Sequence, residues 1–394
     1  MDTVLHNKRI PVAVIRMSDD GQQVLKILSV FHSELFPMSL IHPVQDHWKH
    51  PERAAAAMNR WLRKRRIPPN RDGLSLVLQR EPDFLRDVSQ FSLSDPFWFQ
   101  SKEEEQWETN NFFEHRYAPE PGRLLFEPWT MKDLSRTMLS SPDRTTNGIL
   151  RKHWVQPYTG SDTRSILIKA GRPGGKQNTI SEVLASMALE SLHLVPFVRY
   201  SLTIDGLSFC SSCANFITAD TEFVPASHLY GYFRRQPEDS VLEHLVHTCQ
   251  KLGMRNADKA MDAMLTADAV IGNRDRHLGN FGFIRQAETG VLIGMAPLFD
   301  FGFAFHPEAA EQAGQDSLWT EEEIRTAEIR ACQALDEDMV PDIDPMLNLV
   351  RDVPTLTEDE RVNLIRQIWA FRSTWAGVVR MAHRRTQDRA RGAR

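Results

Sequence analysis

Runs of apolar residues separated by polar turns organise the first part of the chain. Two runs, at 10–17 and 23–30, flank Ser18-Asp19-Asp20-Gly21, and this turn composition predicts a β-hairpin. Three later runs predict strands, at 165–170, 197–204 and 207–216. One helix, at about 180–192, is expected to interrupt these strands.

After about residue 238 the apolar residues follow helical spacing instead. Four helices are predicted there, at 239–252, 257–271, 320–334 and 358–380. The last of them begins with Thr357-x-x-Glu360, which is a capping box. The order predicts three parts, an N-terminal accessory module at 1–125, a β-rich lobe at 126–235, and a helical lobe with a basic tail at 236–394.

Composition narrows the class of protein. The 394 residues are 41% hydrophobic and 25% charged, as in ordinary globular proteins. The net charge is -5, so we expect no direct nucleic-acid binding. No stretch approaches the ~18 apolar residues of a membrane helix, and the start lacks the basic and apolar segments of a secretory signal. We therefore expect no membrane attachment. The low number of cysteines, 4 in all, fits a reduced, cytoplasmic compartment.

The most informative stretch is 272–302. Asp275 and Asn280 lie in the predicted loop that leaves the helix at 257–271. Two strands joined by Glu288-Thr289-Gly290 follow, and the second strand leads to Asp300 in Asp-Phe-Gly. Because a hairpin brings its two ends together, we expect Asp275, Asn280 and Asp300 to converge.

This convergence would suit phosphoryl transfer, which depends on positioning and charge neutralisation. Asp275 could accept the proton of an attacking hydroxyl. Asn280 and Asp300 supply the hard oxygen ligands that Mg²⁺ prefers. The alternative is a polar loop with a capping aspartate and an unrelated turn, which requires three separate coincidences.

A cation for nucleotide phosphates is expected at Lys169, the last residue of a predicted buried strand. Glu182, early on the following helix, could orient this ammonium. Two alternatives remain open. Lys169 could be an exposed strand end, and Glu182 could close a capping box with Thr179.

Five segments occur in a familiar order, at 141–152, 167–169, 180–183, 272–277 and 296–300. Together they resemble the HipA-like serine/threonine kinases of bacteria, over about residues 90–305. The resemblance implies an α+β, bilobed, protein-kinase-like fold that uses ATP and Mg²⁺ to phosphorylate serine or threonine of a protein substrate.

The resemblance also assigns roles by motif. Asp275 becomes the catalytic base, Asn280 and Asp300 the metal ligands, and Lys169 the nucleotide-phosphate lysine. The loop at 140–148 would cover the phosphates. Within it we expect ATP contacts from four consecutive residues, Thr145, Thr146, Asn147 and Gly148.

Several family members are toxins held by a small DNA-binding antitoxin, so an antitoxin is an implied partner. Two other function classes stay open. One is a kinase of lipid or small-molecule hydroxyls, because phosphoinositide-type kinases share Asp-Arg-His-x-x-Asn. The other is a non-catalytic kinase-like binding module, against which the complete set of catalytic residue types argues.

Overall fold

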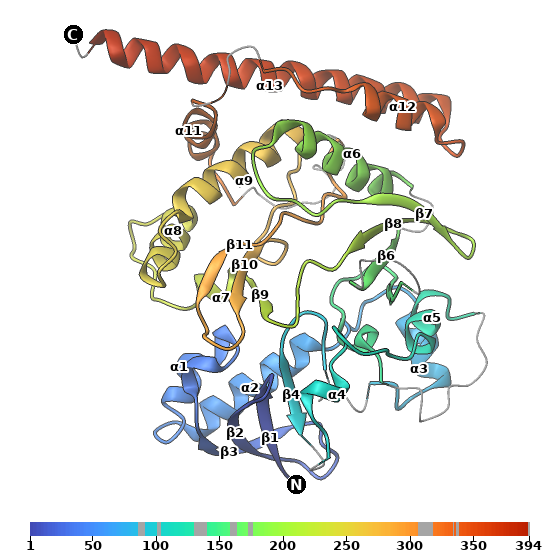
Figure 1. Cartoon of the computed structure of the whole chain (residues 1–394), viewed down its shortest axis with the longest axis vertical. Helices are drawn as coiled ribbons and strands as arrows, with labels where there is room; N and C mark the ends of the chain where they lie inside the picture. The colour runs from blue at the N-terminus through green and yellow to red at the C-terminus, as the bar shows by residue number, and fades with distance from the viewer. Residues whose placement is uncertain are drawn as a thin grey trace.

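The computed structural model describes residues 1–85, 91–100, 104–129, 140–157, 164–171, 176–305, 318–333, 335 and 339–392. Its strands form three antiparallel sheets, and helices lie both between the strands and after the last of them in sequence. Figure 1 shows the N-terminal sheet at one end of the molecule and the C-terminal helices at the other. This mixed architecture is the α+β fold expected from the sequence.

The N-terminal sheet contains the predicted hairpin. Its strands are β1 (Asp2–Asn7), β2 (Ile10–Met17), β3 (Val24–Val30) and β4 (Phe97–Gln100), in the order β3-β2-β1-β4. Gly21 takes a left-handed φ of 67°, which closes the turn between β2 and β3. Helix α2 (Pro51–Arg65) packs on β3 through its buried apolar face. Strand β1 was not predicted, because its apolar positions are few and it is stabilised from both sides by pairing with β2 and β4.

The second sheet lies within the predicted β-rich lobe. Its strands are β5 (Lys152–Val155), β6 (Ile166–Ala170), β7 (Ser201–Asp205) and β8 (Ser208–Ala214), in the order β5-β6-β8-β7. Helix α6 (Gln177–Leu192) packs against it. The strand predicted to begin at Phe197 begins at Ser201. Before that point the backbone of Val198 donates to Leu298 instead, so the segment pairs outside the sheet.

The third sheet has the order β11-β10-β9 and is built from β9 (Thr221–Pro225), β10 (Gly282–Gln286) and β11 (Leu292–Met295). β9 lies in the predicted β-rich lobe and β10 in the predicted helical lobe. This sheet therefore connects the two lobes, which Figure 1 places on either side of it. The β10–β11 hairpin is the one that the sequence predicts around Glu288-Thr289-Gly290.

The four predicted C-terminal helices are confirmed. They are α8 (Val241–Lys251), α9 (Ala257–Ile271), α11 (Glu321–Cys332) and α13 (Glu358–Gly392). The capping box of α13 is present, because Thr357 N–H donates to Glu360 and Glu360 N–H to the Thr357 hydroxyl. α12 (Asp344–Asp352) was not predicted. α13 is 35 residues long, yet no helix of the described ranges combines the length and apolar character that crossing a membrane requires.

Short elements complete the fold. They are α1 (Ile41–Gln45), α3 (Leu74–Arg80), α4 (Trp107–Asn110), α5 (Glu120–Phe126), α7 (Ala226–Tyr230), and the 3-10 turns η1 (Ser33–Leu35), η2 (Met38–Leu40) and η4 (Pro142–Thr145). One large core runs through the molecule and joins Leu5 of β1, Phe283 of β10, Met264 of α9 and Trp375 of α13. A separate hydrophobic cluster joins the segment 67–85 to α5.

Candidate active site

The predicted catalytic loop follows α9. Gly272 ends this helix in the left-handed region, with φ of 68°, a conformation that glycine adopts without strain. Asn280 is buried, and its Nδ2 donates to the Asp275 carbonyl at 2.5 Å. Its Oδ1 accepts from the His277 amide at 2.9 Å. The side chain of Asn280 thus closes the loop across the Asp-to-Asn spacing, while a second lone pair of Oδ1 is available to a further ligand.

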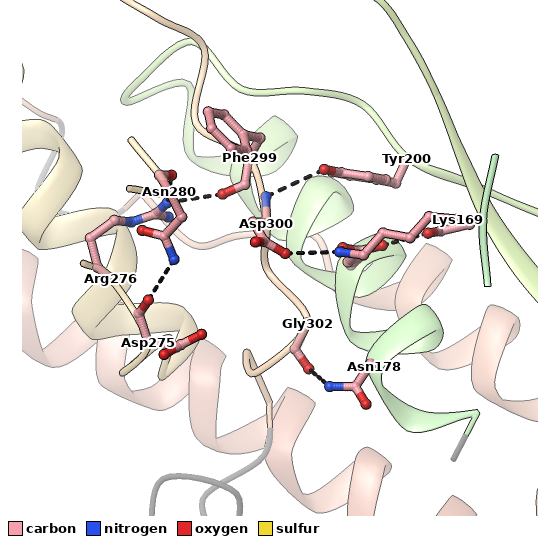
Figure 2. A network of polar contacts seen from close by, with 11 residues as sticks. Lys169, Asn178, Tyr200, Asp275, Arg276, Asn280, Phe299, Asp300 and Gly302 are labelled. Carbon is pink, nitrogen blue, oxygen red and sulfur yellow. Dashed lines mark hydrogen bonds and ion pairs between the residues drawn. The ribbon is translucent and has the colours of Figure 1, made fainter. Parts of the chain in front are cut away.

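Asp300 meets this loop from the other end of the β10–β11 hairpin. Figure 2 shows Asp275 and Asn280 on one side of Asp300 and Lys169 on the other. Asp300 has φ of 61°, a left-handed conformation that costs energy for any residue except glycine. Its backbone N–H donates to the Tyr200 hydroxyl at 3.3 Å. Strained backbone of this kind is concentrated at functional sites.

Arg276 ties the loop to the strand that carries Asp300. It is buried, and its guanidinium forms two hydrogen bonds with the Asp268 carboxylate of α9, at 2.7 and 2.8 Å. Nη1 donates to the carbonyls of Asn280 at 2.8 Å and Phe299 at 2.9 Å. One side chain therefore fixes the backbone on both sides of the site. The sequence assigned no role to Arg276, because its partners lie in three different elements.

Lys169 joins the two lobes at the same point. Its Nζ donates to Asp300 Oδ1 at 2.8 Å and also to Glu182 Oε1. The Ser211 hydroxyl donates to the second oxygen of Glu182, which is 1% exposed. The two alternative interpretations, an exposed lysine at a strand end and a glutamate that caps its helix, are therefore wrong. Lys169 is paired and largely buried, and Glu182 lies in the second turn of a helix that has no side-chain cap.

The charges of this triad stabilise one another. Burial alone would lower the pKa of Lys169, but the carboxylates of Asp300 and Glu182 raise it above its ordinary value. The ammonium of Lys169 holds the pKa of Asp300 below its usual range, although burial acts in the opposite direction. Lys169 is thus charged and Asp300 ionised at neutral pH.

The predicted phosphate-covering loop follows a different pattern from the expected one. Thr145 and Thr146 are buried, and their hydroxyls donate to the Pro142 carbonyl at 3.0 and 2.9 Å. Asn147 is exposed and Gly148 partly exposed, with φ of 96° at Gly148. Of the four residues expected to contact ATP, Asn147 and Gly148 therefore offer surface to a ligand, while both threonine hydroxyls face the protein.

Lys152 is a residue of the site that sequence reasoning missed. It begins β5 directly opposite Lys169 in the sheet, and a side chain at Gly148 would collide with its ammonium. No hydrogen bond or ion pair joins its ammonium to another described residue. Burial lowers the pKa of Lys152 to about 7, and the charges of Lys169 and Arg71 act in the same direction. The available signal was a lysine four positions after the loop glycine, at the start of a strand.

The donor set fits a magnesium ion shared with phosphates. No group of three or more His, Cys, Asp or Glu that could hold a metal occurs within the described ranges. Asp300 and Asn280 instead offer one ionised carboxylate and one amide oxygen. Mg²⁺ is commonly held by one or two such ligands, with water and substrate phosphates completing its shell.

Comparisons with known proteins agree with this geometry at the level of the fold. No protein-family model matches the chain. A solved chain of the Shewanella oneidensis MR-1 toxin–antitoxin complex of HipA, HipB and operator DNA superposes on 96% of this chain and 99% of its own length, with a TM-score of 0.50 and 12% identity. The chain has the HipA-like kinase fold. This confirms the resemblance and the bilobed, protein-kinase-like architecture expected from the motifs.

A second likeness to this family is local. A stretch of 61 residues is 39% identical to the serine/threonine-protein kinase CtkA of Helicobacter pylori (strain J99), and it spans 16% of this chain and only 18% of that kinase. The crystal structure of H. pylori CtkA covers 61% of this chain and 92% of its own, at 17% identity and a TM-score of 0.46. Beyond the HipA-like fold, activity, substrate and partners are therefore matters for proposal.

Proposed function

We propose that this chain is an ATP- and Mg²⁺-dependent kinase that phosphorylates serine or threonine hydroxyls of a protein. The observation that carries the proposal is the ion pair of Lys169 with Asp300, which joins the β-rich lobe to the β10–β11 hairpin. In kinase-type phosphoryl transfer, a phosphate-binding lysine and a metal-binding aspartate both act on the phosphates of the same nucleotide. Here they belong to separate elements that the fold brings into contact.

In this proposal each residue of the site has a separate role. Lys169 and Lys152 contact nucleotide phosphates, and Gly148 lets the loop approach them closely. Asn280 and Asp300 hold Mg²⁺, which neutralises charge on the phosphate oxygens when bound. Asp275 accepts the proton of the attacking hydroxyl.

Thr145 and Thr146 have a supporting role in this proposal. Their hydroxyls bond to the Pro142 carbonyl within the same loop, so they shape the loop beneath the nucleotide. Of the four residues expected to contact ATP, Asn147 is the one whose side chain is exposed enough to contact it directly.

An antitoxin partner is part of the proposal. The Shewanella HipA complex contains HipB and operator DNA. By analogy we propose that a small protein holds this chain as well. The expectation that the chain avoids nucleic acid finds no support in this fold.

The experiment compares wild-type protein with Asp275→Asn and with Asp352→Asn as a matched control, since Asp352 is exposed at the end of α12. Mg·ATP binding is measured by calorimetry, and labelled phosphate is followed from ATP into the protein itself and into a cell extract. We expect all three proteins to bind ATP and only Asp275→Asn to fail in transfer. Label in lipids or small molecules would favour the alternative kinase class. Binding without transfer by the wild type would favour a binding module.

A further inference from the structure

Arg71 reaches the nucleotide-covering loop from the predicted N-terminal module. It lies between α2 and α3 and is 3% exposed. Its Nε donates to the Gly148 carbonyl at 2.8 Å, and its Nη2 donates to the Thr146 carbonyl. The next residue, Asp72, donates its backbone N–H to the Ile149 carbonyl at 2.9 Å. Three hydrogen bonds therefore clasp the backbone of 146–149 from one side.

The segment 67–85 that carries Arg71 is anchored on α5 and on the start of the β-rich lobe. Its apolar side chains pack against Leu124 and Leu125 of α5 in a cluster separate from the main core. Arg80 Nη1 donates to the Pro128 carbonyl at 2.7 Å. Near the end of the segment, the Phe84 carbonyl accepts two hydrogen bonds from Arg144, at 2.9 and 2.6 Å. The segment is thus held by the packing of Ile67 before Arg71 and by the hydrogen bonds of Arg80 and Phe84 after it.

Arg71 has more hydrogen-bond donors than its two carbonyl partners use. Its third nitrogen, Nη1, is buried and has no hydrogen-bond partner among the described residues. Burial lowers the pKa of Arg71 to about 10, although Asp143 acts to raise it, so the guanidinium is charged at neutral pH. An unpaired buried donor opposes folding. The same charge lies close enough to Lys152 to lower its pKa. Positive potential beside Gly148 stabilises a bound phosphate, and it destabilises the folded protein when no phosphate is bound.

We propose that Arg71 is a positioning residue for nucleotide binding. By fixing the carbonyls of Thr146 and Gly148, it holds the loop in the shape in which Lys152 lies against Gly148. The nucleotide site is then composite, because the segment 67–85 sets its affinity for ATP. The ligand identity rests on the proposed function, whereas the clasp itself does not.

The test uses full-length protein in three variants. Arg71→Lys keeps the charge but cannot span two carbonyls, and Arg71→Met removes both the charge and the two hydrogen bonds. The control is Arg63→Met, at an exposed arginine near the end of α2. Amide hydrogen exchange of 146–149 is measured without nucleotide, and Mg·ATP affinity by calorimetry. Loss of charge-assisted hydrogen bonds predicts roughly 10- to 100-fold weaker ATP binding for both Arg71 variants. We expect faster exchange at 146–149 in both, a raised KM for ATP with kcat nearly retained, and wild-type behaviour in Arg63→Met.

The outcomes distinguish a positioning role of Arg71 from a purely structural role. A lower melting temperature with unchanged ATP affinity and unchanged exchange at 146–149 would make Arg71 purely structural and overturn the proposal. If Arg71→Met fails to fold, the Arg71→Lys protein supplies the same comparison. If wild-type protein binds no ATP, the proposed function fails, while exchange at 146–149 in the variants still supports or refutes the clasp.

Discussion

Replacing Lys152 by methionine separates a structural lysine from a phosphate-binding one. Methionine has a similar length and no charge, so packing around β5 should hold. In the folded protein, burial and two neighbouring cations lower the pKa of Lys152 from its ordinary 10.5 to about 7. A lysine placed for stability would have its pKa raised by an anionic partner. Lys152 therefore opposes folding, and its removal should stabilise the protein without nucleotide.

The size and pH dependence of this effect follow from linkage. A shift from 10.5 to about 7 corresponds to about 5 kcal/mol. Between these two pKa values the unfolded chain binds a proton that the folded protein lacks. The unfolding free energy of the wild type therefore rises with pH there, by at most about 1.4 kcal/mol per unit from this group. The advantage of Lys152→Met is full at and below pH 7 and disappears toward pH 10.

The assay is urea unfolding at pH 7, 8 and 9, followed by tryptophan fluorescence, with Lys26→Met, at an exposed position of β3, as control. Mg·ATP affinity is measured on the same proteins. We expect Lys152→Met to be more stable than wild type at pH 7, to lose this advantage as pH rises, and to bind ATP at least tenfold more weakly. A less stable variant with the same deficit at every pH, or one with wild-type ATP affinity, would refute the reasoning.

Three further predictions concern neighbouring charges. Asp275→Asn should lower phosphoryl transfer by about 10²–10⁴ while Mg·ATP affinity, read by calorimetry, stays near wild type. Lys169→Ala should abolish activity and also lower the unfolding free energy by about 3–5 kcal/mol, because it leaves buried Glu182 without its cation. Adding Glu182→Gln should restore part of the melting temperature and none of the activity. Burial raises the pKa of Asp143 to about 7, above its ordinary 3.8. This carboxyl therefore makes stability fall as pH rises from 4 to 7, and in Asp143→Asn the difference between urea midpoints at pH 5 and 8 should shrink.

Local patterns predicted the parts of the site that are close in sequence. Asp275 and Asn280 share one loop, and Asp300 follows a short hairpin, so turn composition and apolar runs were enough to expect their convergence. Four helices after 238, namely α8, α9, α11 and α13, followed from apolar spacing and, in α13, from its capping box, whereas α12 did not. These features depend on interactions within a few residues of each other.

The features that were missed depend on distant partners. Thr145 and Thr146 look like exposed loop hydroxyls in the sequence, yet the 3-10 turn at Pro142–Thr145 directs both hydroxyls to the Pro142 carbonyl. The strand predicted at Phe197 starts later, because Leu298 takes over its backbone pairing. β1 has its place in the sheet through pairing with strands on both sides.

The sequence by itself determined which chemical groups are present, their order, and the local elements that carry them. Tertiary structure decided which of them meet. Lys169 and Asp300 are 131 residues apart, and Arg71 and Gly148 are 77 apart. Contacts at such separations form only when the core orders the intervening chain, so no local propensity encodes them. The same packing fixes the charge states, because desolvation and opposing carboxylates act only in the folded protein. Thus one lysine of an adjacent pair forms ion pairs with Glu182 and Asp300, while the other, Lys152, forms no ion pair with any residue that the structure describes.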